Sequence, residues 1–101
     1  MAPERRKVTY QRRASADVKA AYSWYEEQRA GLGEEFLEGL SQTEALAAAL
    51  PLACPRVHRN TRRALLKRFP YGLYFRLDND ELIVVACYHA SRDPKGWRHR
   101  S

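Results

Sequence analysis

The chain has 101 residues and a mass of 11.7 kDa, with 45% hydrophobic and 30% charged residues, which fits one globular domain over residues 1–101 and excludes a fibrous or disordered chain. No apolar run reaches the roughly 18 residues that span a bilayer, so we expect a cytoplasmic protein without membrane contact. The net charge of +6 arises in the second half, because residues 1–50 hold 7 Lys/Arg against 8 Asp/Glu and residues 51–101 hold 11 against 4. We therefore expect an acidic or polyanionic partner for the second half.

A strand and a helix are predicted first. Residues 7–11 alternate, with Val8 and Tyr10 on one face, as expected of a half-buried strand. Apolar residues then recur at intervals of three and four, which is typical of an amphipathic helix; this stripe comprises Ala14, Val18, Ala21, Tyr22 and Tyr25. We expect Ser15 to be the N-cap, Asp17 to lie in the first turn, and the helix to end at Ala30-Gly31.

A second helix is predicted to begin near Gly33, where Glu34 and Glu35 suit the positive end of the helix dipole. Its inner stripe comprises Phe36, Leu40, Thr43, Ala47 and Leu50, and Pro51 and Pro55 end it. Because only residues 29–33 separate the two helices, we expect an antiparallel hairpin with a shared apolar face.

From Arg56 onward the apolar residues recur with a period of two, which indicates strands. Residues 56–58 are compatible with a short strand, and a turn at residues 59–61 leads to a strand predicted over residues 62–69. After a turn at residues 70–72, Leu73, Phe75 and Leu77 face one way and Tyr74 and Arg76 the other. Residues 82–88 are apolar on both faces, which predicts the central strand of the sheet.

These elements predict an α+β fold of order β-α-α-β-β-β, with the helical hairpin packed on a mostly antiparallel four-stranded sheet. Residues 90–101 form a short basic C-terminal tail, in which Asp93-Pro94 and Gly96 disfavour a further strand. Cys54 and Cys87 lie in different segments without CxxC spacing, so we expect two buried free thiols.

Several short strings recur in an order and at separations that resemble one family. They are Ala16-Asp17-Val18, Trp24-Tyr25-Glu26, Gly31-Leu32-Gly33 followed by Phe36, Arg68-Phe69-Pro70-Tyr71, and His89 to Pro94 followed by Trp97. Together they cover about 90 residues and resemble the toxins of the RelE/ParE superfamily, which are the poison halves of bacterial type II toxin-antitoxin pairs. The resemblance implies the same β-α-α-β-β-β fold.

The resemblance leaves the target open between two branches. RelE-like toxins cut mRNA in the ribosome, whereas ParE-like toxins act on DNA gyrase, and an antitoxin wraps and neutralises both. The tryptophan-tyrosine-glutamate run, the glycine turn and the RFPY and HxxRDP strings favour the ParE-like branch. A third alternative is a weakly toxic or inactive member that serves mainly to bind its antitoxin. In each case we expect a hetero-oligomer with an acidic antitoxin encoded next to it.

Ribonuclease chemistry is the alternative activity that the residues allow. Metal-free RNA cleavage needs a base, an acid and cations around the phosphate, and His89, Tyr88 and Arg68 are the candidate catalytic residues. Some relatives of the mRNA-cutting branch end in a His-Tyr pair, but here the pair is reversed and twelve residues follow it. This half also has only two lysines, Lys67 and Lys95, where the RelE enzymes have many. For His89, anchoring the following turn by hydrogen bonding is the alternative role.

Contact with a target or with nucleic acid is the second group of expected roles. The candidates are Arg62, Arg63, Lys67, Arg92, Lys95, Trp97, Arg98 and Arg100, with His58, Arg62 and Arg63 expected on one side of the sheet. Trp97 is expected to anchor an interface, because its basic tail offers little core to bury it. Tyr22, Trp24 and Tyr25 are expected to pack in the core. No motif indicates a metal or a cofactor, so we expect neither.

Overall fold

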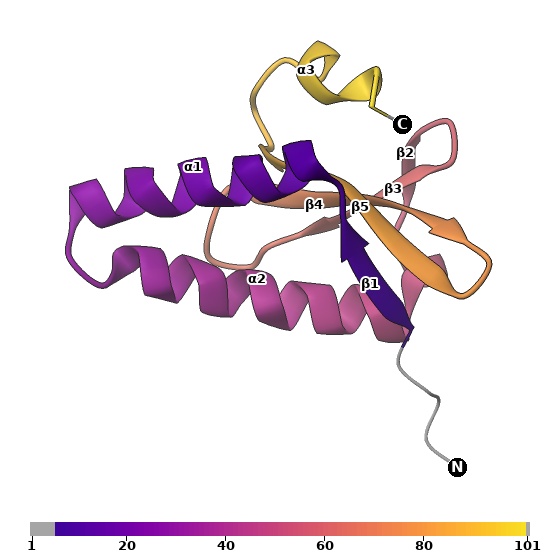
Figure 1. Ribbon diagram of the computed structural model, residues 1–101, viewed down its shortest axis with the longest axis horizontal. Coiled ribbons are helices and arrows are strands. Elements are labelled where there is room, and N and C mark those ends of the chain that lie inside the picture. Colours follow the sequence, from indigo (N-terminus) through magenta and orange to yellow (C-terminus); the bar gives the residue numbers. More distant parts are fainter. Residues whose placement is uncertain (1–5, 101) are drawn as a thin grey trace.

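The computed structural model describes residues 6–100, which form a helical hairpin across one face of a sheet and a short helix apart from the hairpin (Figure 1). The elements are β1 (Lys7–Tyr10), α1 (Arg12–Gln28), α2 (Leu32–Ala49), the 3-10 helix η1 (Pro51–Ala53), β2 (Arg56–His58), β3 (Thr61–Leu65), β4 (Tyr71–Asp78), β5 (Glu81–His89) and α3 (Lys95–Arg98). The predicted α+β class and helical hairpin are confirmed. In this part of the chain no helix is both long and apolar enough to cross a membrane.

The sheet has five strands in the order β1-β5-β4-β3-β2, one more than predicted. The additional strand is β2, which residues 56–58 form by pairing with β3 as an antiparallel hairpin. All neighbours are antiparallel except β1 and β5, which run parallel from Lys7↔Glu81 to Tyr10↔Val84. The middle position belongs to β4, not to residues 82–88 as expected, and β5 is the inner strand between β4 and β1.

Helix α1 begins four residues earlier than predicted, because its N-cap is Gln11 and not Ser15. The first turn is closed by the Ser15 N–H, which donates to the Gln11 carbonyl at 3.0 Å, so Gln11 is the N-cap and Ser15 lies inside the helix. Asp17 is consequently beyond the first turn. It contacts the sheet instead, because its Oδ2 accepts the Cys87 N–H at 3.1 Å and the Arg100 Nη1 at 2.6 Å.

The shared apolar face of the two helices is confirmed along most of its length. Ala14, Ala21 and Tyr25 of α1 and Phe36, Leu40, Thr43 and Ala47 of α2 are buried as their spacing predicts. The exception is Leu50, which is 58% exposed because α2 ends at Ala49, and its place in the core is taken by Ala48. Strand β3 also ends earlier than predicted, at Leu65, and the following loop inserts Phe69 into the core under the helices.

A β-bulge in β5 changes which of its side chains face the helical hairpin and which face the opposite side of the sheet. Tyr74 pairs with Ala86 but Phe75 pairs with Val84, so Val85 is an extra residue in β5. Val84 and Cys87 pack under the helical hairpin, whereas Val85 and Ala86 both belong to a second cluster with Tyr74, Tyr88 and Trp97. One strand therefore contributes to both hydrophobic clusters.

The C-terminal segment covers the second cluster, which contradicts the expectation that Trp97 lacks a core. Trp97 is only 3% exposed, and its ring centroid lies 4.3 Å from that of Tyr74. Arg100 fastens the same segment to α1 through its ion pair with Asp17, in which the two side chains are 12% and 15% exposed. The tail is thus part of the folded structure, and Trp97 is not presented to a partner.

Candidate functional site

Three of the strings that suggested a family meet where the helical turn packs on the sheet. Tyr25, Phe36, Phe69 and Tyr71 come from α1, α2, the β3–β4 loop and β4, and their rings form one aromatic cluster. The Tyr25 centroid lies 5.3 Å from that of Phe36 and 4.9 Å from that of Phe69, and the Phe36–Tyr71 distance is 5.3 Å. Because such ring contacts are specific in geometry as well as apolar, they fix how the hairpin end meets the sheet.

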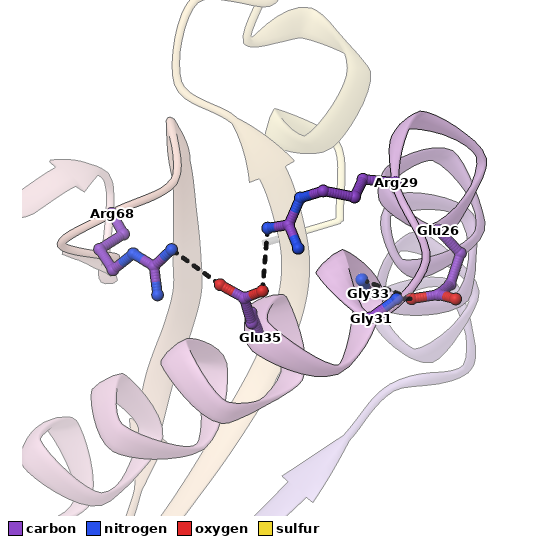
Figure 2. A network of polar contacts seen from close by, with 6 residues as sticks. All are labelled: Glu26, Arg29, Gly31, Gly33, Glu35 and Arg68. Carbon is purple, nitrogen blue, oxygen red and sulfur yellow. Dashed lines mark hydrogen bonds and ion pairs between the residues drawn. The ribbon is translucent and has the colours of Figure 1, made fainter.

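The turn between the helices depends on two glycines and one carboxylate. Gly31 has a φ of 90°, a left-handed conformation that favours glycine. Gly33 is needed for a different reason, since an added Cβ would lie 2.8 Å from both Glu26 Cγ and the Tyr22 ring. Glu26 Oε1 accepts the N–H groups of Gly31 and Gly33 at 2.9 and 2.8 Å (Figure 2). The end of α1 therefore satisfies two free backbone donors at the start of α2.

Arg68, a candidate catalytic residue, is held by a carboxylate of α2. Glu35 lies between Arg68 and Arg29 and accepts a hydrogen bond from each at 2.9 Å (Figure 2). These two guanidinium groups, Arg68 foremost, lower the pKa of Glu35. The network ties the helical turn to the β3–β4 loop at the surface, and it occupies part of Arg68's capacity to contact a phosphate.

A groove of about 350 Å³ runs between α2 and the end of β3. Leu46 and Leu65 line it and are 56% and 52% exposed, so the groove presents apolar surface to solvent. Glu38 lines the groove on the α2 side and Lys67 on the opposite side, while Phe69 links it to the aromatic cluster. We call this the α2–β3 groove.

A second, smaller cavity of about 230 Å³ lies between α1 and β5 and is lined by Asp17, Trp24, Tyr71, His89 and Arg92, among others. We call it the α1–β5 cleft. The His89 ring is fixed, because its Nδ1 accepts the Ser91 N–H at 3.1 Å and lies 2.8 Å from Ser91 Oγ. Burial raises the pKa of the Tyr71 phenol above its ordinary value. These contacts support the expected turn-anchoring geometry of His89.

The candidate ribonuclease residues do not form one reacting set. Tyr88 also lines the α1–β5 cleft, but it belongs to the second cluster and its ring lies under the Arg92 guanidinium at 4.7 Å. The His89 ring lies 5.3 Å from Tyr71, which packs with the helix-side core. Arg68 belongs to the α2–β3 groove instead. Tyr88 and His89 therefore share one cavity, while Arg68 lies at another, so the three candidates do not line a common site.

Both the sequence and the fold of this chain are similar to known toxins or toxin-antitoxin systems. The sequence matches the family model of the ParE toxin of the type II toxin-antitoxin system parDE over residues 8–94. The chain belongs to the ParE toxin family. Its fold is similar to that of a chain of the chromosomal ParDE toxin-antitoxin system from P. aeruginosa, with a TM-score of 0.74 over 85% of this chain and 97% of that chain at 19% identity. No functionally curated protein matches the sequence.

The basic residues expected to contact a target are distributed over different parts of this ParE-family chain. Arg62 and Arg63 lie on opposite faces of the sheet, because their cross-strand partners are Phe75 of the helix-side core and Tyr74 of the second cluster. His58 lies on the face of Tyr74 and Trp97, because its ring centroid is 6.0 Å from that of Trp97. The expectation of a shared side is therefore wrong for Arg62, whose Nη1 instead donates to the Cys54 carbonyl at 2.7 Å. Lys67 lines the α2–β3 groove, and Lys95 and Arg98 lie on α3.

Sequence reasoning missed two residues of this ParE-family surface. Trp24 was expected in the core, but it is 54% exposed at the α1–β5 cleft, with its ring edge-on to Tyr25 at 5.1 Å. Asp17 was treated as a helix-start residue, although it joins α1, β5 and the tail. The sequence feature that pointed to a role for Asp17 was its position in the Ala16-Asp17-Val18 string. Arg100, expected to bind a target, is the partner of Asp17 and is largely buried.

Proposed function

We propose that this protein is the toxin of a type II toxin-antitoxin module that blocks replication by acting on DNA gyrase and that an acidic antitoxin neutralises it. Membership of the ParE family is the observation that carries the proposal. The separation of Arg68 from Tyr88 and His89 favours binding over RNA cleavage. The toxin then acts by occupying its target, without itself cleaving a bond.

The α2–β3 groove is the surface best suited to the antitoxin. An amphipathic helix docks through apolar side chains spaced at i, i+3, i+4 and i+7, and it needs an elongated apolar groove. Leu46 and Leu65 supply exposed apolar surface there, flanked by Lys67 and Arg68 as well as by Glu35 and Glu38. The P. aeruginosa chain of similar fold comes from a ParDE toxin-antitoxin system, which supports an antitoxin as the partner.

The target is tested with purified protein and gyrase holoenzyme. We expect inhibition of supercoiling of relaxed plasmid and accumulation of cleaved DNA complexes. In parallel, the protein is added to ribosomes carrying mRNA, where we expect no cleavage. Cut mRNA with unaffected gyrase would show that the RelE-like alternative is correct, and harmless overexpression with neither activity would support an inactive member that only binds its antitoxin.

The antitoxin site is tested with a charge placed in the groove. Leu46→Asp combined with Leu65→Asp should weaken antitoxin binding by roughly 100-fold, because binding would bury each new carboxylate against the apolar face of the antitoxin helix. Leu52→Asp is the matched control, since Leu52 is 73% exposed and lines neither cavity. Binding is measured by calorimetry with the product of the adjacent gene. Unchanged affinity of the double variant would place the antitoxin elsewhere.

A further inference from the structure

We propose that the α1–β5 cleft is the target-recognition site and that it receives a carboxylate-bearing side chain, flanked by an apolar one, from a protein segment of the target. The inference rests on the proposed gyrase-directed function, and it separates the surface that recognises the target from the surface that binds the antitoxin. Four features of the cleft carry it.

The first feature is the strand edge beside which the cleft lies. Strand β1 accompanies β5 only as far as Val84, whose carbonyl accepts the Gln11 N–H at 2.9 Å, and the chain then turns away into α1. Beyond that point side chains serve the outward backbone groups of β5, with Asp17 accepting the Cys87 N–H and Arg100 donating to the Val85 carbonyl at 3.3 Å. Among the described residues no strand pairs with this edge of β5 from Val85 to His89, and Cys87, Tyr88 and His89 line the cleft that opens beside it.

The second feature is the sign of the charge. Asp17 is the carboxylate in the cleft lining, and Arg100 compensates its charge at 2.6 Å. Arg92 also lines the cleft and takes part in none of the ion pairs found among residues 6–100. Because Nδ1 of His89 accepts the Ser91 N–H, the neutral ring carries its proton on Nε2 and has a donor left to offer. The cleft thus has two hydrogen-bond donors, Arg92 and His89, and its acidic residue, Asp17, is already neutralised by Arg100. This combination favours an anionic occupant.

The third feature is Trp24 at the same cleft. A tryptophan that is 54% exposed yet held edge-on against Tyr25 is a rigid apolar surface that loses little freedom on binding. Tryptophan and arginine are the residues most often found at the centres of protein interfaces, where they account for much of the binding energy. Their proximity here fits an apolar residue beside the carboxylate of the occupant.

The fourth feature is size. The cavity volume of about 230 Å³ lies below the roughly 300–1,000 Å³ of sites that enclose a small molecule. It suits one or two inserted side chains. A nucleic-acid strand requires a row of cations that follows successive phosphates, whereas this cleft offers Arg92 and the neutral-ring donor of His89. A protein segment is the occupant that the geometry favours.

The test uses the intact chain with gyrase holoenzyme and with its antitoxin. We expect Arg92→Glu to weaken gyrase inhibition by roughly 100-fold and Trp24→Ala by roughly 30-fold. Arg92→Lys should retain part of the activity, because it keeps the charge but loses the planar fork. Matched controls are Arg56→Glu and Leu52→Ala, which change an exposed arginine and an exposed leucine outside both cavities. All variants should bind antitoxin within twofold of the wild type.

Growth arrest after induction is measured for each variant, so that the cleft is tested whatever the target. Full toxicity of Arg92→Glu and Trp24→Ala, or equal losses in the two controls, overturns the assignment of the cleft. Arrest by the wild type with unaffected gyrase overturns the gyrase proposal alone. A wild type that neither arrests growth nor inhibits gyrase overturns both. Loss of binding to a 20-nucleotide RNA in Arg92→Glu, with gyrase inhibition unchanged, makes the cleft a nucleic-acid site and also overturns the proposal.

Discussion

Gly33 and Gly39 lie on the same helix but differ in the space around them. A Cβ at Gly33 would meet Glu26 and Tyr22 at 2.8 Å, whereas a Cβ at Gly39 would meet nothing nearer than Phe69 at 3.7 Å. We therefore expect Gly33→Ala to destabilise the protein by about 2 kcal/mol through overpacking. Gly39→Ala should stabilise it by about 0.5–1 kcal/mol, because alanine favours the helix. Urea denaturation measures both, and equal effects of the two substitutions would contradict the steric account of the helical turn.

Glu35 gives the link between the helical turn and the β3–β4 loop a defined pH dependence. Because Arg68 and Arg29 lower its pKa in the folded protein, its stabilising contribution is present above the unfolded value of about 4.3 and is lost as pH falls through the folded value. We expect Glu35→Gln to be less stable than the wild type at pH 6 and equally stable near pH 2. Thermal unfolding at the two pH values checks this. A stability difference that persists at the lower pH would assign it to something other than the carboxylate charge.

Individual side chains were predictable where spacing decides their environment and unpredictable where a helix end decides it. Tyr25 is buried as the stripe on α1 requires, and its neighbour Trp24 is exposed. The two are adjacent in sequence, and both are large aromatics that suit a core. The α1 stripe includes Tyr25 and omits Trp24, so spacing separates the two where residue type does not. Leu50 shows the opposite case, because the end of α2 at Ala49 leaves it 58% exposed.

At the scale of elements, α3 packs most closely on the sheet where Gly96 faces Tyr88. A Cβ on Gly96 would lie 1.8 Å from the Tyr88 hydroxyl and 2.7 Å from its ring carbon Cζ. We expect Gly96→Ala to displace α3 and to expose Trp97, at a cost of about 2 kcal/mol. In a Trp24→Phe background, where Trp97 is the sole indole, the emission maximum should move to the red. Adding Tyr88→Phe should reverse part of that shift, and an unchanged spectrum in Gly96→Ala would refute the close packing.

Helices α1 and α2 and the strands β1, β3, β4 and β5 were predicted from the spacing of their apolar residues, because that spacing shows which residues are buried. Element α3 was not, since a four-residue helix has no repeat to detect. Strand β2 is three residues long and depends on pairing with β3, which explains why its sequence alone was ambiguous. The two cavities form where elements distant in sequence meet, so the sequence could name their basic residues but could not group them.

At the scale of the whole molecule, both ends of the described chain stabilise the same strand. Strand β5 has β1 on one side and β4 on the other, and Arg100 contacts its bulge. Because the pairing of β1 with β5 joins residues about 70 positions apart, the sheet is complete only when most of the chain has folded. Global unfolding is therefore expected to be cooperative.

The rate at which the Cys87 thiol reacts with a labelling reagent measures global unfolding. Burial, with a further contribution from Asp17, raises its pKa to about 12, so very little reactive thiolate forms at pH 8. Cys54 is only partly buried. We expect Ellman's reagent to label Cys54 first and to label Cys87 at the rate of global unfolding, with Cys54→Ser as the control that isolates Cys87. Rapid labelling of Cys87 in native buffer would indicate local opening of β5.

The extra residue at Val85 has an evolutionary consequence. Removing one amino acid there would restore simple alternation, so that every side chain from Ala86 onward would exchange sides relative to the ladder. The His89 side chain would then lie on the α3 side of the sheet and the Tyr88 side chain on the side of the helices, with the rest of the fold unchanged. A single-codon deletion or insertion in this strand is thus a short mutational path. Through it, homologous proteins with the same fold would present different chemical groups to different targets.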